Sequence, residues 1–169
     1  MSPLINFYRG TAPDSEGRML QEIWAWSDQE LEAVHDFIQW LFPLPEPSRF
    51  NPEAPLLTPA DITAFTKEPL LRDNLRRSFE RILSFLGLSW VEDGSVQEGP
   101  NFTARAPDVW LAPNHNWLRI TRILRSLTLL GLQAEAKALY ERLKTLSSGR
   151  NLPITTETFR YWTEAVRTR

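Results

Sequence analysis

The segment from Trp117 to Leu130 carries apolar residues on both sides of the helix that its spacing predicts. The main apolar face of this helix comprises Trp117, Ile120, Ile123, Leu124, Leu127 and Leu130. Leu118 and Leu129 fall on the other side, among three arginines. A helix that is apolar on both sides is typical of a central position in a fold. The chain is therefore expected to pack other elements around this helix and to hold its arginines partly out of water.

Helical spacing and end signals recur along the rest of the chain. Ser27 and Glu30 form a capping-box pattern at the start of a helix that Pro43 stops. Other helices are expected to begin at Thr58, Pro69, Trp117, just after Gly131 and at Thr155. Residues 92–113 are expected to form a loop, and no segment alternates long enough to predict a strand. We therefore predict an all-α fold: one domain, residues 1–169, that forms a compact, irregular bundle of about six helices.

The segment between the first two of these helices is rich in proline. Its prolines are Pro43, Pro45, Pro47, Pro52 and Pro55. Proline restricts the backbone and so lowers the entropy that a loop loses on folding. This segment is therefore predicted to be an ordered loop against the bundle and not a flexible linker.

Composition excludes several classes of chemistry. The chain has no cysteine, which excludes disulfides, thiolate nucleophiles and cysteine metal sites and favours a reducing compartment. A net charge of −2 and a pI near 5.8 make DNA an unfavourable partner. The sequence contains neither an apolar run of the roughly 18 residues that a membrane span needs nor a secretion signal. We expect a cytoplasmic protein without a transmembrane segment, cofactor or metal, and no catalytic residue is assigned because no catalytic motif occurs.

Charge is distributed unevenly along the chain. Residues 14–53 contain nine acidic residues and two arginines, for a net charge of −7, whereas residues 113–150 have a net charge of +5. We interpret the two regions as packing together, so that arginines of the central helix pair with Asp28, Glu32 or Asp36. The alternative is that these arginines bind an external anion, such as a phosphate or a peptide carboxylate.

Two groups of polar residues are candidates for ligand binding. His35 and Gln39 are four residues apart in a predicted helix, where a half-buried histidine can serve as a base, as a ligand or, most commonly, as a structural hydrogen-bonding residue. His115, Arg119 and Arg122 follow one line along the central helix, and donors at the start of a helix favour anions. The predicted ligand-binding residues are His35, Gln39, Trp40, His115, Asn116, Arg119 and Arg122.

Three stretches carry a family resemblance. They are NFYRGTAPD at residues 6–14, HDFIQWLFPLPEPSRFNPEAPLLT at residues 35–58 and HNWLRITRILRSLTLLGL at residues 115–132. Together they resemble the conserved region of the opioid growth factor receptor family, as a free-standing domain without the repeat tail of the vertebrate members. The resemblance spans nearly the whole chain.

The resemblance implies a binding or regulatory module whose ligand is a short peptide or another protein. Animal members are described as nuclear or perinuclear receptors for a short opioid peptide, which offers an ammonium group, two rings and a carboxylate. We expect the ammonium group to be bound by Glu32 or Asp36 and the rings by tryptophans such as Trp40 and Trp117. The carboxylate is expected to be bound by Arg119 or Arg122.

The alternative function is that of a small enzyme or sensor. It would act on an anionic small molecule through His115, Arg119 and Arg122, with His35 as a possible base.

Overall fold

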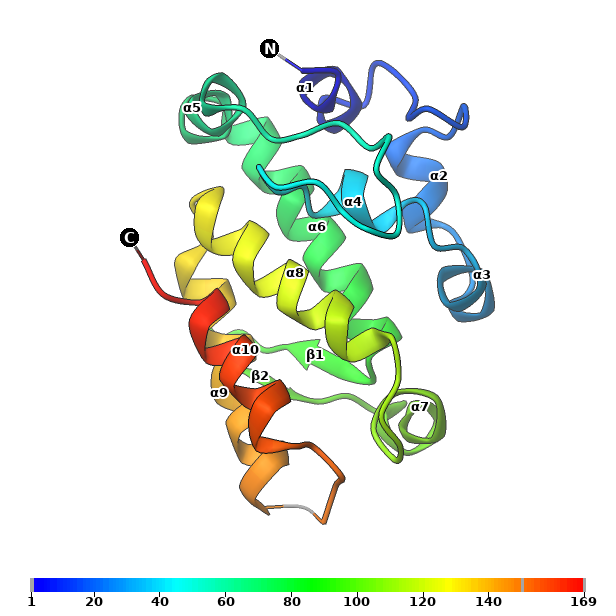
Figure 1. The fold of residues 1–169 in the computed structure, drawn as a ribbon, viewed down its shortest axis with the longest axis vertical. Helices are drawn as coiled ribbons and strands as arrows, with labels where there is room; N and C mark the ends of the chain where they lie inside the picture. The colour runs from blue at the N-terminus through cyan, green and yellow to red at the C-terminus, as the bar shows by residue number, and fades with distance from the viewer. Residues whose placement is uncertain (1, 150, 169) are drawn as a thin grey trace. The chain divides into compact units, whose positions relative to one another are not determined.

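The computed structural model describes residues 2–149 and 151–168, and within them the all-α prediction is confirmed (Figure 1). The first elements are α1 (Leu4–Tyr8), α2 (Leu20–Trp24), α3 (Asp28–Ala33), α4 (Ile38–Leu41), α5 (Pro59–Lys67) and α6 (Pro69–Phe85). They are followed by β1 (Leu88–Trp90), β2 (Val96–Glu98), α7 (Phe102–Val109), α8 (Asn116–Leu129), α9 (Gln133–Gly149) and α10 (Thr156–Ala165). In these described residues, no helix is both long enough and apolar enough to cross a membrane.

The chain divides into two compact units, with the boundary after Phe79, inside α6. The first unit contains α1 to α5 and the start of α6, and the second contains the remaining elements. The single-domain organisation expected from the sequence stays a prediction.

Aromatic side chains from distant segments form the core of the first unit. The ring of Phe7 in α1 lies edge-on to Trp40 in α4, with centroids 5.2 Å apart, and the ring of Tyr8 lies edge-on to Phe65 in α5 at 5.4 Å. The Tyr8 hydroxyl donates to the backbone oxygen of Leu41, and burial raises the pKa of Tyr8 well above its ordinary value. Short helices α1 and α4 are thus held by side-chain packing, because helices of this length are unstable alone.

The predicted capping box at Ser27 and the predicted helix start at Thr58 are confirmed. Ser27 Oγ accepts from the backbone N–H of Glu30 at 3.1 Å, and the Glu30 carboxylate accepts from the N–H of Ser27 at 3.1 Å. Thr58 and Asp61 form the same arrangement at the start of α5. Asp61 also accepts from the N–H of Ser2 at 3.0 Å, so one buried carboxylate joins the start of the chain to α5.

The predicted helix from Ser27 to Pro43 is wrong as a continuous element. Val34 has an extended backbone (φ −93°, ψ 129°), and the chain turns through residues 34–37 before α4 begins. All seven residues from 37 to 43 are buried. A helix at the surface of a core buries only one face. Burial of seven consecutive residues therefore requires the chain to leave the continuous helix that the spacing predicts.

The second unit is built around α8, as the sequence predicts. Helices α9 and α10 both pack against α8, and in Figure 1 the three lie side by side in yellow, orange and red. Helix α9 buries one face against its neighbours, formed by Ala136, Leu139, Leu143 and Leu146. Leu118, on the second apolar side that the sequence predicts, is 58% exposed. At its start, α8 therefore buries only its main apolar face.

The prediction of a loop over residues 92–113 is wrong. Strand β2 pairs with β1 in an antiparallel hairpin, with Ser89 opposite Gln97, and α7 follows despite Pro107 in its interior. Three-residue strands are too short for alternation to reveal them. Helix α7 persists because the Trp110 N–H still bonds to the oxygen of Ala106 at 2.8 Å, and the indole N–H of Trp110 donates to Leu86 at 2.8 Å.

Gly87 follows the end of α6 with φ +79°, and it lies against α7. A Cβ at this position would come within 2.9 Å of the Phe102 Cα atom. Gly94 has a similar backbone (φ +85°), but nothing lies within 4 Å of the Cβ that it would carry.

We expect Gly87→Ala to lower the free energy of unfolding by about 3 kcal/mol, because left-handed strain and a backbone clash add together. Gly94→Ala is the matched control and pays only the strain, about 1–2 kcal/mol. Urea denaturation of both variants checks this prediction. Equal losses would contradict the close packing of α7 on Gly87.

Candidate functional site

In the first unit, residues 14–18 form a tight loop organised by one buried carboxylate. Asp14 is 5% exposed, and its Oδ1 accepts from the backbone N–H groups of Glu16 and Arg18, each at 2.9 Å. Gly17 lies at φ +80° and donates its N–H to the backbone oxygen of Asp14 at 3.1 Å. Asp14 thus plays the role of the aspartate in an Asx turn, and the loop presents Arg18 in a fixed direction.

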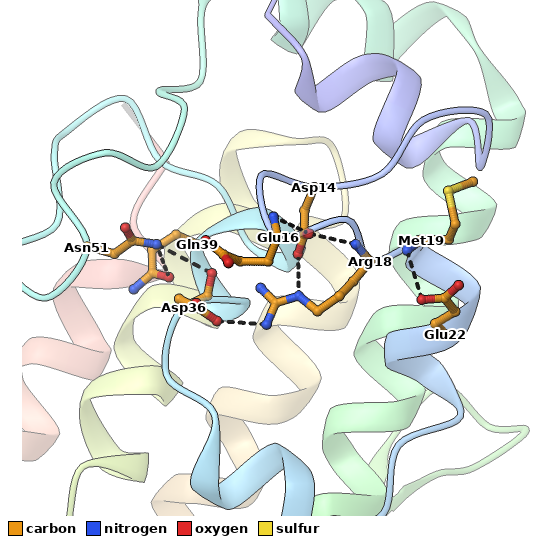
Figure 2. Close-up of polar contacts among 8 residues, drawn as sticks. All are labelled: Asp14, Glu16, Arg18, Met19, Glu22, Asp36, Gln39 and Asn51. Carbon is orange, nitrogen blue, oxygen red and sulfur yellow. Dashed lines mark hydrogen bonds and ion pairs between the residues drawn. The ribbon is translucent and has the colours of Figure 1, made fainter.

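Arg18 connects this loop to Asp36, which lies two residues before the start of α4. Its Nε donates to Asp14 Oδ2 at 2.8 Å, and its Nη1 donates to Asp36 Oδ1 at 2.8 Å (Figure 2). Its guanidinium also lies over the Trp26 ring, 5.4 Å from the centroid. Burial lowers the pKa of Arg18, but the hydrogen bonds to Asp36 and Asp14 outweigh burial and hold the pKa above its ordinary value.

Asn51 of the proline-rich segment contacts the same region. Its Nδ2 donates to the backbone oxygen of Asp36 at 3.4 Å and to Gln39 Oε1 at 3.3 Å (Figure 2). Gln39 is 4% exposed, whereas the Asp36 side chain is 46% exposed. The region therefore gathers oxygen acceptors: one half-exposed carboxylate, one backbone oxygen and one side-chain amide oxygen. Such a set is suited to a ligand that donates hydrogen bonds or carries positive charge.

The structure separates the three predicted ligand residues of this unit. His35 lies in the irregular turn between α3 and α4 and is exposed, so the expectation that it is half-buried on one helical face with Gln39 is wrong. Gln39 lies within the oxygen-rich region. Trp40 is 3% exposed, and its Nε1 is buried without an acceptor in the described part of the chain. The Trp40 ring is therefore a core residue in this conformation.

In the second unit, the start of α8 is tied down by asparagines. Asn114 donates through Nδ2 to the backbone oxygens of Val109 (2.8 Å) and Ala112 (2.7 Å), and its Oδ1 accepts from the N–H of Asn116 at 2.9 Å. Asn116 is fully buried, and its Oδ1 accepts from Arg119 Nη1 at 3.3 Å. The start of α8 therefore uses internal partners for these donors.

The predicted line from His115 to Arg122 runs from solvent into the protein and back. His115 is exposed, Arg119 is 7% exposed and Arg122 is half-buried. The Arg119 guanidinium lies over the Phe85 ring, 6.0 Å from the centroid. The expected desolvation of the arginines is thus confirmed for Arg119, and the role of this line in ligand binding stays a prediction.

Sequence reasoning missed Arg18, Asp14 and Asn51. The turn signal was present in the sequence as Asp14 followed three residues later by Gly17. Asn51 directly precedes Pro52, which also marks a turn. Nothing local reveals that Arg18 pairs with Asp36, because the two are 18 residues apart.

Comparison with known proteins gives one family. The model of the opioid growth factor receptor conserved region matches residues 4–169. The mouse opioid growth factor receptor is 42% identical over 113 residues, covering 64% of this chain and 17% of the receptor. The human receptor is 37% identical over 140 residues, covering 78% and 20%, and mouse opioid growth factor receptor-like protein 1 is 35% identical over 137 residues, covering 77% and 29%.

The chain thus spans less than a third of the length of these curated relatives. No solved structure matches it.

We expect Arg18→Met to lower the free energy of unfolding by about 3 kcal/mol, because it leaves the buried Asp14 carboxylate without its charged partner. Arg49→Met, at an exposed arginine of the proline-rich segment, is the control and should change stability by less than about 0.5 kcal/mol. Guanidinium chloride denaturation measures both. A loss at Arg18 no larger than at Arg49 would show that the bridge does not hold the loop.

Proposed function

Because the chain belongs to the opioid growth factor receptor family, we propose that it is a receptor-like binding module for a short peptide or a peptide segment of a protein partner. The relatives' names describe receptors for an opioid growth factor. The observation that carries the proposal is the oxygen-rich region of the first unit. There the half-exposed carboxylate of Asp36 offers an acceptor at the surface, next to the buried Gln39, and Arg18 holds Asp36 in place.

The charge of this region supports a ligand that carries an amino group. Asp36 is the half-exposed member of the Arg18 cluster, and residues 14–53 have a net charge of −7. An ammonium group that donates to a carboxylate makes a charge-assisted hydrogen bond, which is about twice as strong as a neutral one. Asp36 is therefore the proposed partner of the peptide's ammonium group, and Glu32 remains the alternative.

The aromatic residues expected to contact the ligand, Trp40 and Trp117, are not exposed, whereas Phe50 is. Trp40 and Trp117 are 3% and 5% exposed, so their rings are engaged in the core. Phe50 is 72% exposed and Leu56 is 42% exposed, both on the proline-rich segment that carries Asn51. We propose that Phe50 supplies an aromatic surface beside the amino-group site.

A second candidate function rests on the buried arginine of α8. Arg119 is 7% exposed, and the exposed His115 stands one helical turn away at the start of α8. This pair supports binding of a small anionic molecule. A sensor or enzyme for such a molecule is the alternative to the peptide module.

Titration calorimetry with an opioid pentapeptide tests the proposal. We expect a Kd on the order of micromolar, since a flexible peptide must repay its ordering entropy. Acetylating the peptide's amino group should weaken binding about tenfold or more, because a charge-assisted hydrogen bond is lost.

Asp36→Asn should weaken binding of the free peptide, whereas Asp73→Asn, at a 67% exposed aspartate of α6, should leave it unchanged. The absence of heat with any form of the peptide at millimolar concentration would contradict peptide binding. Heat with phosphate alone would favour the anionic small molecule.

A further inference from the structure

The chain between Leu44 and Leu56, here called the strap, is closed on itself but hardly buried. The N–H of Leu57 donates to the backbone oxygen of Leu44 at 3.0 Å, which joins its two ends. None of residues 44–56 is buried, although Pro43 before them and Leu57 after them are. Hydrophobic burial therefore holds the ends of the strap and contributes little along its length.

One residue in the middle of the strap connects it to α4. Asn51 begins a turn in which the N–H of Ala54 donates to the Asn51 backbone oxygen at 3.1 Å. The side chain of Asn51 then reaches Asp36 and Gln39 through a single nitrogen, as Figure 2 shows. Both bonds are long, at 3.4 and 3.3 Å, so each lies at the weak end of the range for N–H donors.

The acceptors that Asn51 occupies suit a charged donor better than a neutral amide. Asp36 Oδ2 has no hydrogen-bond partner among the residues that the structure describes, and this side chain is 46% exposed. A carboxamide adds no charge that could interact with this carboxylate. An ammonium group has three donors and a positive charge, so it can donate to neutral oxygens and also interact with the charge of a carboxylate.

A second observation concerns the side-chain amide of Gln39. The residue is 4% exposed, and its Oε1 accepts the hydrogen bond from Asn51 at 3.3 Å. Its Nε2 has no protein acceptor among residues 2–149 and 151–168 and keeps contact with solvent. A peptide that brings a carbonyl oxygen next to its amino group can accept a hydrogen bond from this nitrogen.

We propose that the Asn51 side chain occupies the place of a peptide's amino group. The strap is then an autoinhibitory element, which the peptide's free amine displaces from Asp36 and Gln39. The proposal rests on the peptide-binding function proposed above and adds how access to that site is controlled. In the closed state the strap competes with the ligand, so part of the ligand's binding energy is used to release it.

Removing the competing side chain should therefore strengthen binding. We expect Asn51→Ala to bind the free-amine opioid pentapeptide about threefold to tenfold more tightly than the wild type, the range that weak neutral hydrogen bonds imply. Asn6→Ala, at an exposed asparagine of the same unit, is the matched control and should not change the Kd. The amino-acetylated peptide should gain nothing from Asn51→Ala, because it has no ammonium group to place.

The outcomes separate this inference from the function on which it rests. If the wild type and Asn51→Ala both fail to bind the peptide at millimolar concentration, the proposed function and the inference fall together. If the wild type binds and Asn51→Ala binds equally or more weakly, Asn51 is a structural or ligand-contacting residue, and only the inference is overturned.

Trypsin provides a second measurement. Arg49 is exposed in the strap, so mass spectrometry can follow cleavage of the bond between Arg49 and Phe50. We expect Asn51→Ala to speed this cleavage by about threefold to tenfold, because the two hydrogen bonds from Asn51 are lost. Saturating free-amine peptide should speed it in the wild type. Unchanged cleavage in Asn51→Ala, or slower cleavage with peptide, would show that Asn51 does not latch a displaceable strap.

Discussion

The Arg18 guanidinium joins two segments of the first unit through two carboxylates. It joins Asp14, which organises the loop of residues 14–18, to Asp36, which precedes α4. An arginine can do this because its nitrogens diverge in one plane, so two carboxylates can be held at once from different directions. Side-chain packing holds α4 itself, whereas this bridge fixes the direction of the Asp36 carboxylate just before it.

The proline-rich segment shows how order can exist with little burial. Its prolines reduce the entropy of the unfolded chain, so a few contacts are sufficient to define the loop. Those contacts are the backbone bond between Leu44 and Leu57 and the side chain of Asn51. A segment held in this way can be ordered when closed and still open at modest cost, which is the property that regulation of a binding site needs.

The parts of the fold that sequence predicts well depend on local chemistry. The capping boxes at Ser27 and Thr58 and the left-handed Gly87 are set by residues within four positions of one another. The break before α4 was missed because it depends on the burial of residues 37–43 and on the long-range pair between Arg18 and Asp36.

The candidate site was harder to predict for the same reason. Assigning His35 and Gln39 to one face assumed a continuous helix, and the break puts His35 in solvent while Gln39 is buried. In contrast, the buried Arg119 follows from the apolar spacing of α8, which the sequence shows directly. The cytoplasmic location remains a prediction from composition.

The most direct test of the account is to follow the side-chain NH₂ resonances of Asn51 by NMR while the free-amine peptide is added. Asn51→Ala assigns these signals, because they disappear in its spectrum. We expect these signals to shift on titration toward the position of a solvated carboxamide, and the amino-acetylated peptide to leave them unmoved. A bound peptide that leaves the Asn51 signals in place would contradict displacement of the strap from Asp36 and Gln39.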